Sequence, residues 1–235
     1  MPRIDLNCDL GEGAGQDGEL MPLITSANIA CGAHAGDADT MRATVELALR
    51  YKVAVGAHPS LPDRENFGRI ETPVGPEEVR LLVLSQTRLL QIIARQSGAA
   101  VTHVKPHGAL YNMAARDAEI AGAVARAVHE ADPQLVLFGL AGSQLIAAGK
   151  AAGLRVAGEI FADRAYLADG SLQPRNQPGA MIADARVAVA QVLRLAREGA
   201  DTVCLHGDGP QAVFFARKLR EALAAARVEI KPFGP

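Results

Sequence analysis

The sequence contains no tryptophan, and aromatic residues make up only 4% of its 235 positions. A core without large rings must be built from aliphatic side chains, which supply most of the 49% hydrophobic content. This composition favours helices packed on a sheet over an aromatic-rich β sandwich, because layered α/β domains bury their sheets under aliphatic side chains.

Cysteine and net charge are also low. Cys8, Cys31 and Cys204 form an odd set without CxxC spacing, which argues against a disulfide framework or a structural zinc site and fits a reducing compartment. A formal net charge of −2 provides no basic surface for nucleic acid or an anionic membrane. No run approaches the ~18 apolar residues of a membrane span, and the N-terminus lacks the apolar segment of a signal peptide. We therefore expect a cytoplasmic protein with no nucleic-acid or membrane partner.

Strand-like apolar runs alternate with helical patterns along the chain. We predict strands near 3–9, 26–31, 53–58, 101–105, 135–139, 155–161 and 202–206, and helices near 38–51, 76–96, 117–131, 142–152, 183–197 and 210–226. Such alternation predicts βαβ units and a parallel sheet. The expected fold is a single domain over residues 1–235, an incomplete or distorted (β/α) barrel, with an open doubly wound sheet as the alternative.

Polar residues break the apolar pattern of these strands on one face, toward the carboxyl end of each strand. Successive residues of a strand point to opposite faces, and a parallel sheet covered by helices should be apolar on both. Because α/β barrels and open sheets carry their active sites at this end, we expect one shared polar cavity. Its candidate residues are Asp5, Asn7, Asp9, Asn28, His34, His58, His103, Lys105, His107, Glu159, Asp163, His206 and Asp208.

Two carboxylates follow the first strand. Asp9 and Glu12 suit a general base or a metal ligand, although Glu12, like Asp17, would also serve to cap a turn in this glycine-rich loop. Asp9, His58 and His107 together would suit a divalent metal such as Zn²⁺. A metal-free, hydrogen-bonded acid–base cluster is the alternative, because no HxxxH or HExxH spacing decides between them.

Several cationic positions indicate an anionic ligand. Lys105, on a face expected to line the cavity, needs either a phosphate or a protein carboxylate. Arg64 and Arg69 lie in the long loop 59–75, and arginine binds carboxylate and phosphate through paired hydrogen bonds. The segment 206–210 joins the last strand to a helix, whose N-terminus favours anions. No Walker A sequence occurs and no GxGxxG opens a helix, so standard nucleotide-binding folds are not indicated.

The motifs together resemble those of the LamB/YcsF family, which is associated with the A component of bacterial ATP-dependent 5-oxoprolinase. The matching stretches are Asp5–Glu12, Ser26–Gly32, His34–Asp37, Gly56–Pro59, Val104–Asn112, Phe161–Tyr166, Asp169–Leu172 and His206–Asp208. The sequence departs from the family pattern at Ala14 and Ala33, where phenylalanine is usual, at Ile70, where a second arginine is common, and at Gly209, where threonine or serine is common.

This resemblance implies a distorted seven-stranded (β/α) barrel similar to the glycoside hydrolase/deacetylase superfamily. It implies ring opening of 5-oxo-L-proline (pyroglutamate) to L-glutamate, coupled to hydrolysis of ATP to ADP and phosphate, with partner subunits B and C. Two other functions remain open. One is a metal-dependent de-N-acylase, and the other is a non-catalytic subunit that binds the lactam for a partner enzyme.

A working hypothesis assigns roles to the candidate residues. Lys105 and His206 would stabilise phosphate or an oxyanion, and Asp9, assisted by His58 or His107, would activate water. Asp163 or Glu159 would orient one of the histidines. The residues expected to bind substrate are Arg64 or Arg69, which would hold its carboxylate, and Asn7, Asn28, His34, Glu159 and Asp208.

Overall fold

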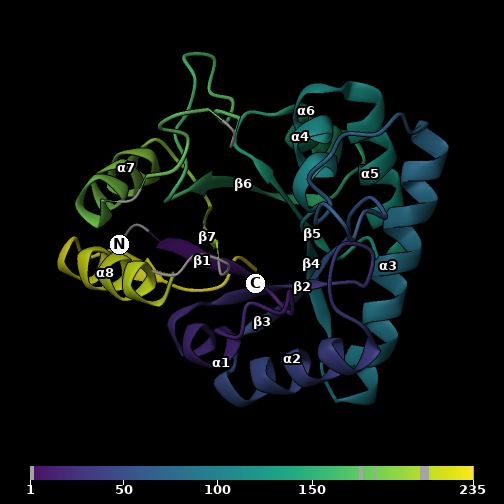
Figure 1. Cartoon of the computed structure of the whole chain (residues 1–235), viewed down its shortest axis with the longest axis horizontal. Helices are drawn as coiled ribbons and strands as arrows, with labels where there is room; N and C mark the ends of the chain where they lie inside the picture. Colours follow the sequence, from purple (N-terminus) through teal and green to yellow (C-terminus); the bar gives the residue numbers. More distant parts are fainter. Residues whose placement is uncertain (1–2, 175–176, 183, 207–211, 235) are drawn as a thin grey trace.

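Seven parallel strands close into a barrel in the computed structural model, which describes residues 3–174, 177–182, 184–206 and 212–234 and only the backbone of His206. The strands neighbour one another in chain order, and β1 pairs with both β2 and β7, which closes the barrel (Figure 1). The predicted barrel is therefore confirmed and the open doubly wound sheet is wrong. The strands are β1 (Arg3–Leu10), β2 (Ser26–Ala30), β3 (Ala54–His58), β4 (Val101–Val104), β5 (Val136–Leu140), β6 (Arg155–Phe161) and β7 (Thr202–His206).

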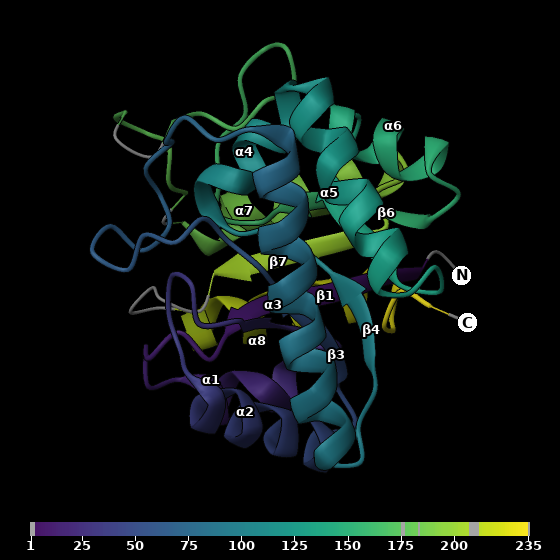
Figure 2. The same ribbon diagram turned by 90° about the vertical axis from the view of Figure 1, so that its right-hand side faces the viewer.

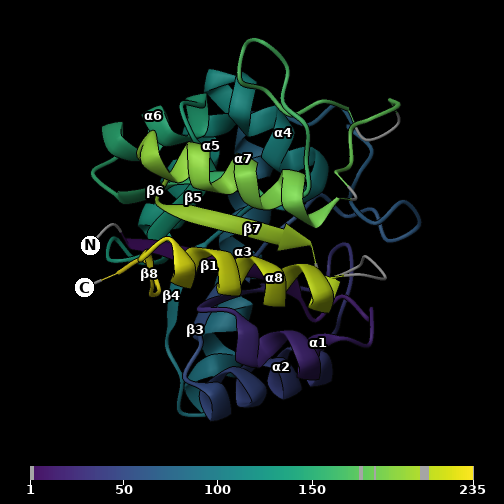
Figure 3. The same cartoon turned by 90° about the vertical axis from the view of Figure 1, so that its left-hand side faces the viewer.

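Helices surround the barrel. Figure 2 shows α3 running along one side with α5 beside it, and Figure 3 shows α7 and α8 side by side on the opposite side. Among the described residues, no helix is long and apolar enough to cross a membrane. The helices are α1 (Asp17–Leu20), the 3₁₀ turn η1 (Met21–Leu23), α2 (Ala38–Tyr51), α3 (Pro76–Gln96), α4 (Gly108–Arg116), α5 (Ala118–Ala131), α6 (Gln144–Ala151), α7 (Ala185–Arg197) and α8 (Ala212–Ala225).

Capping residues explain where several helices begin. The helices predicted from 117, 142 and 183 begin at 118, 144 and 185, because Asp117, Ser143 and Asp184 occupy the N-cap positions. Each of these side chains accepts a hydrogen bond from a backbone N–H of the first turn, which would otherwise lack a partner. The helix predicted over 210–226 is described as α8 from Ala212 to Ala225, and positions 210 and 211 lie outside the described residues.

Some short elements were not predicted from the sequence. Helix α4 follows directly after His107, and the long loop 59–75 holds its start: the N–H of Ala109 donates to the carbonyl of Gly68 at 2.9 Å. A two-residue strand, β8 (Glu229–Ile230), pairs with the first residues of β1. Both depend on contacts between distant segments, so local periodicity does not reveal them.

The two faces of β1 explain how the fold positions a site. Ile4, Leu6 and Cys8 are buried and belong to the main hydrophobic core between barrel and helices. The alternate residues, Asp5, Asn7 and Asp9, are equally buried. Burying polar groups without partners costs several kcal/mol each, about 2–7 for a neutral group. The barrel interior must therefore satisfy them internally.

Candidate active site

At the amino-terminal end of the barrel interior, hydroxyl groups surround the buried carboxylate of Asp5. Thr25 and Ser26 donate to its Oδ1, each at 2.7 Å, and Thr202 donates to its Oδ2 at 2.5 Å. Burial raises the pKa of Asp5, although these hydrogen bonds oppose the shift. The Nδ2 of Asn7 donates to Thr202 Oγ1 at 2.7 Å and so connects this layer to the next one toward the mouth.

Lys105 is the centre of the next layer. Its side chain is 2% exposed, and its Nζ lies 3.0 Å from Asp9 Oδ1 and 2.9 Å from Glu159 Oε1. The same ammonium contacts Asn7 Oδ1 at 3.2 Å and Cys204 Sγ at 3.0 Å. Burial by itself lowers the pKa of Lys105, but the nearby carboxylate of Asp9, with that of Glu159, outweighs burial and raises it well above its usual value. Lys105 is therefore a fixed positive charge.

A chain of hydrogen bonds orients the carboxylate of Asp9. The Nδ2 of Asn28 donates to Asn7 Oδ1 at 2.7 Å and to Asp9 Oδ1 at 2.8 Å. The Oδ1 of Asn28 must then accept from His103 Nε2, 2.9 Å away, so we assign the Nε2–H tautomer to His103. Its Nδ1 lies 3.0 Å from the hydroxyl oxygen of Thr102, which also donates to the carbonyl of Val55 at 3.1 Å. Burial, with the charge of Lys105, lowers the pKa of His103 to about 3, which keeps the ring neutral.

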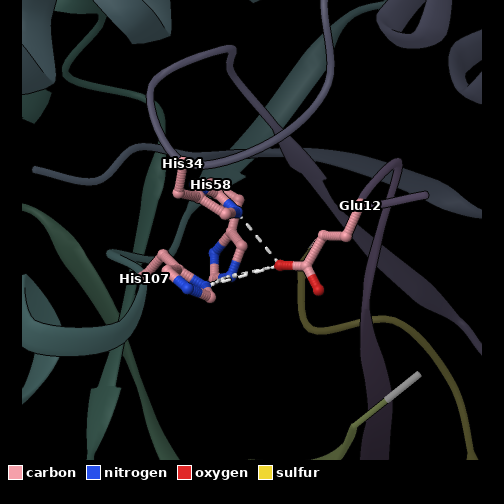
Figure 4. A group of neighbouring side chains, drawn as sticks. All are labelled: Glu12, His34, His58 and His107. Carbon is pink, nitrogen blue, oxygen red and sulfur yellow. Dashed lines mark hydrogen bonds and ion pairs between the residues drawn. The ribbon is translucent and has the colours of Figure 1, made fainter. Parts of the chain in front are cut away.

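Three histidines and a carboxylate meet nearer the mouth (Figure 4). Glu12 Oε1 lies 3.1 Å from His34 Nε2, 3.4 Å from His107 Nδ1 and 3.9 Å from His58 Nε2. His107 Nδ1 and His58 Nε2 are 2.9 Å apart, and the His34 and His107 rings stack with centroids 3.8 Å apart. One ligand atom from each of the four residues lies within 4.8 Å of the others, an arrangement compatible with a divalent metal.

The histidines of this cluster differ in their electrostatic surroundings. Burial lowers the pKa of His34 and of His107. Burial also acts to lower the pKa of His58, but the carboxylate of Asp9, with Oδ2 3.4 Å from His58 Nε2, outweighs it and raises that pKa. Asp9 therefore connects the two layers, because its Oδ1 contacts Lys105 and its Oδ2 faces the histidines.

A cavity of about 780 Å³ opens above these layers. This volume falls in the range of about 300–1,000 Å³ that is usual for small-molecule sites. Its wall includes Arg69 and Arg164, together with Arg116, which forms an ion pair with Glu71. Asp9, Glu12, His58, Lys105 and His107 also line it. The cavity thus has carboxylate, imidazole and ammonium groups on one part of its wall and guanidinium groups on another.

The structure brings many predicted residues together but separates others. Arg64 is exposed and donates to the carbonyl oxygens of Gly32 and Gly36, so it holds the segment that carries His34 rather than the cavity wall. Asp163 is partly buried, and its carbonyl accepts from the N–H of Ile182. The side chain of His206 and the whole of Asp208 lie outside the described residues.

The alternative roles of the carboxylates in the first loop are now distinguished. Asp17 Oδ2 accepts from the N–H of Gly11 at 2.8 Å and closes the turn, whereas Glu12 points to the histidines. The sequence reasoning did not identify Tyr111 and Arg164 as cavity-wall residues. Both lie in stretches that carried the family resemblance, 104–112 and 161–166, and this was the only available signal. Burial raises the pKa of Tyr111 well above its usual value, and the charge of nearby Glu159 adds to the shift.

Comparisons with known proteins extend over the whole chain. The model of the LamB/YcsF family matches residues 4–235. A crystal structure of a lactam utilization protein from Thermus thermophilus is 44% identical, covers 98% of this chain and 100% of its own, and superposes with a TM-score of 0.91.

More distant structures share the fold alone. A putative cellobiose-phosphate cleavage protein from Enterococcus faecalis is 13% identical, with coverage of 98% of this chain and 97% of its own and a TM-score of 0.62. The catalytic domain of a peptidoglycan N-acetylglucosamine deacetylase from Eubacterium rectale is 12% identical, with coverage of 99% and 88% and a TM-score of 0.55. These similarities show the same barrel fold and agree with the predicted fold class.

Proposed function

The chain belongs to the LamB/YcsF family, and from this premise we propose that it opens the ring of 5-oxo-L-proline to form L-glutamate. It would act as the A component of an ATP-dependent 5-oxoprolinase, together with partner subunits B and C. The 44% identical lactam utilization protein supports a lactam as the substrate class. The structural observation that carries the proposal is the buried ammonium of Lys105, which lines the cavity and is held between the carboxylates of Asp9 and Glu159.

The chemistry explains why ATP and this set of groups are needed. A lactam is a resonance-stabilised amide with a poor leaving group. Transfer of a phosphoryl group from ATP to the carbonyl oxygen releases ADP and makes the ring carbon electrophilic. Water then adds to that carbon, the ring C–N bond breaks, and the nitrogen leaves as an amine. The resulting acyl phosphate reacts with a second water to give glutamate and phosphate.

The cavity residues suit these steps. Lys105 would stabilise the negative charge of the transferred phosphoryl group, since a fixed, desolvated cation needs no reorganisation during the reaction. Asp9 would take a proton from the attacking water and return it to the departing nitrogen. Arg69, which lines the cavity, would bind the substrate carboxylate in preference to Arg64, whose Nη1 donates to two backbone carbonyls.

Reconstitution tests the proposal. The full chain is combined with candidate subunits B and C, pyroglutamate and ATP, and release of both glutamate and phosphate is measured. Asp9→Asn keeps the size of the side chain but removes the base, so glutamate formation should fall by about 10²- to 10⁴-fold. The matched control is Asp39→Asn, which alters an exposed ion pair with Arg42 and should leave the rate unchanged.

Two outcomes would contradict the proposal. If Asp9→Asn retained near wild-type glutamate formation in the assembled complex, the assigned base would be wrong. If the complex required the chain for pyroglutamate binding and yet tolerated both Asp9→Asn and Lys105→Met, the chain would be a non-catalytic lactam-binding subunit.

The histidine and glutamate cluster favours a second candidate, a metal-dependent de-N-acylase. A bound divalent ion would supply a Lewis acid for an amide carbonyl. Metal-loaded and chelator-treated protein would be compared for acetate release from N-acetylated amino sugars. Metal-dependent acetate release without partner subunits would favour this reading, and its absence together with ATP-coupled glutamate formation would remove it.

A further inference from the structure

We infer that Glu12, His34, His58 and His107 form a binding site for one divalent transition-metal ion of the Zn²⁺ type. The four residues come from different parts of the chain: the segments after β1 and β2, the end of β3, and the segment between β4 and α4. Figure 4 shows their side chains converging on one point from these elements. This set differs from Asp9, His58 and His107, the ligands suggested by the sequence.

Each histidine is fixed by a hydrogen bond on the ring nitrogen that faces away from the cluster. His58 Nδ1 lies 2.7 Å from the carbonyl oxygen of Lys105, and His107 Nε2 lies 2.9 Å from that of Phe67. A carbonyl can only accept, so each of these nitrogens must carry a proton. The other nitrogen of each neutral ring therefore presents its lone pair to the cluster.

The third histidine follows the same pattern through a hydroxyl group. His34 Nδ1 lies 2.9 Å from Ser60 Oγ, and the hydroxyl of Ser60 donates to the carbonyl of Leu61 at 2.9 Å. Ser60 Oγ must therefore accept from His34, which leaves the lone pair of His34 Nε2 directed at Glu12. A ring N–H bonded to an oxygen on the far side is the usual support of a metal-ligating histidine.

The spacing of the inward atoms suits one small ion. Four ligand atoms about 2.1 Å from a tetrahedral Zn²⁺ lie about 3.4 Å from one another. The contacts of Glu12 Oε1 with the three ring nitrogens are 3.1, 3.4 and 3.9 Å, and the two facing nitrogens of His58 and His107 are 2.9 Å apart. These four distances bracket the tetrahedral value, and every pair of ligand atoms lies within 4.8 Å, so the ligand atoms would need to draw together around a bound ion.

A cation also resolves the electrostatic conflict in the cluster. The three ring lone pairs and the carboxylate of Glu12 are all hydrogen-bond acceptors. One extra proton between His58 and His107 would provide a donor for the contact between these two rings and for none of the other contacts in the cluster. Imidazole and carboxylate are ligands that suit Zn²⁺ and similar ions. Asp9 lies beside the site, but its Oδ1 already accepts from Lys105 and Asn28.

The backbone around His107 adopts an unfavourable conformation where it supports this proposed ligand. Phe67 has φ of 58°, a left-handed conformation that is unfavourable for a side chain with a Cβ, and its carbonyl faces His107. The loop also packs closely against the start of α4: a Cβ on Gly108 would lie only 2.4 Å from the carbonyl oxygen of Gly68. The loop 59–75 is thus held tightly where it supplies a partner to a ligand.

Metal binding by the full chain, without substrate or partner subunits, tests the inference. Protein stripped with a chelator is titrated with Zn²⁺ in competition with a chromophoric chelator, and Co²⁺ is used to record the visible spectrum. We expect one ion per chain. Glu12→Gln, His34→Gln and His107→Gln should each weaken binding by more than about 100-fold, the upper range for loss of a supporting residue alone. His129→Gln, on the exposed face of α5, should leave binding unchanged.

Further variants separate this ligand set from others. Asp9→Asn should weaken binding by less than about 100-fold, the range for a neighbour that is not itself a ligand, and so by less than Glu12→Gln. Circular dichroism checks the fold of each variant, and Glu12→Gln, on a loop, keeps the test valid if a histidine variant unfolds.

Three results would overturn the inference. These are failure to bind one ion per chain, affinity unchanged in Glu12→Gln, and a thiolate-to-cobalt charge-transfer band, which would place the ion on a cysteine. The measured quantity is metal affinity, so failure to bind metal would leave the lactam proposal intact. Conversely, failure of lactam turnover would not account for a lack of metal binding.

Discussion

Removal of the charge on Lys105 tests whether the stability of the fold depends on this buried cation. Lys105→Met keeps the length of the side chain but leaves Asp9 and Glu159 without their cation, and these side chains are only 7% and 0% exposed. Breaking a buried ion pair by removing one partner costs about 3–5 kcal/mol. Since two carboxylates lose the same partner, we expect the upper part of that range, a large share of the ~5–15 kcal/mol that stabilises a typical domain.

Urea unfolding followed by far-ultraviolet circular dichroism measures this loss, because the chain has no tryptophan to report by fluorescence. The matched control is Lys218→Met, which removes an exposed ion pair with Glu221 and should cost no more than about 1 kcal/mol. Adding Glu159→Gln to Lys105→Met removes one uncompensated charge and should recover part of the loss. A loss below about 1 kcal/mol for Lys105→Met, or no recovery in the double variant, would refute this reasoning.

Three further predictions concern packing, pH and metal. Gly56→Ala should lower the free energy of unfolding by at least about 1–3 kcal/mol in urea titrations, because its Cβ would lie 2.0 Å from the ring of His103, which stacks on Phe138; a neutral effect would contradict the packing. Burial raises the pKa of Asp5 above 3.8, so the folded state binds this proton more tightly than the unfolded chain. The contribution of Asp5 to stability should therefore be largest at acid pH and fall as pH rises from below 3.8 through the folded pKa; unfolding measured against pH should show this slope in the wild type and not in Asp5→Asn, and parallel curves would contradict it. Zn²⁺ at 100 times its dissociation constant should stabilise the chain by about 2.7 kcal/mol, seen as a chelator-reversible rise in Tm that Glu12→Gln abolishes; an equal rise in that variant would place the ion elsewhere.

The strand residues of the site were predictable from the sequence because side-chain direction in a strand is a local property. Asp9, His58 and Lys105 each lie at or just beyond the end of a strand, and parallel strands bring those ends to one mouth. The alternation of side chains along the strand also placed His103 inside the barrel. This alternation could not show that His103 orients Asn28 rather than facing the cavity. That distinction depends on depth in the barrel, which is set by the stagger between strands.

The loop residues were harder to place, because their directions depend on contacts between distant segments. Arg64 and Arg69 looked equivalent in the sequence, yet one binds the backbone of the loop after β2 and the other lines the cavity. Glu12 was ambiguous until Asp17 was seen to close the turn. His34 was expected only to contact substrate, and its position against Glu12 is set by Ser60 in another loop.

The two functional layers of the mouth are not independent, because one carboxylate contacts both. Asp9 Oδ1 accepts from Lys105, and its Oδ2 lies 3.4 Å from the nitrogen of His58 that faces Glu12. A cation bound among the histidines would draw on the charge of Asp9 and so weaken its hold on Lys105, since a carboxylate shared between two cations is bound less strongly by each. The proposed base for water therefore lies at the boundary between the ammonium and the proposed metal site. This position accounts for the arrangement of Asp9, whose Oδ1 is held by Asn28 and Lys105 while its Oδ2 is directed at the histidines.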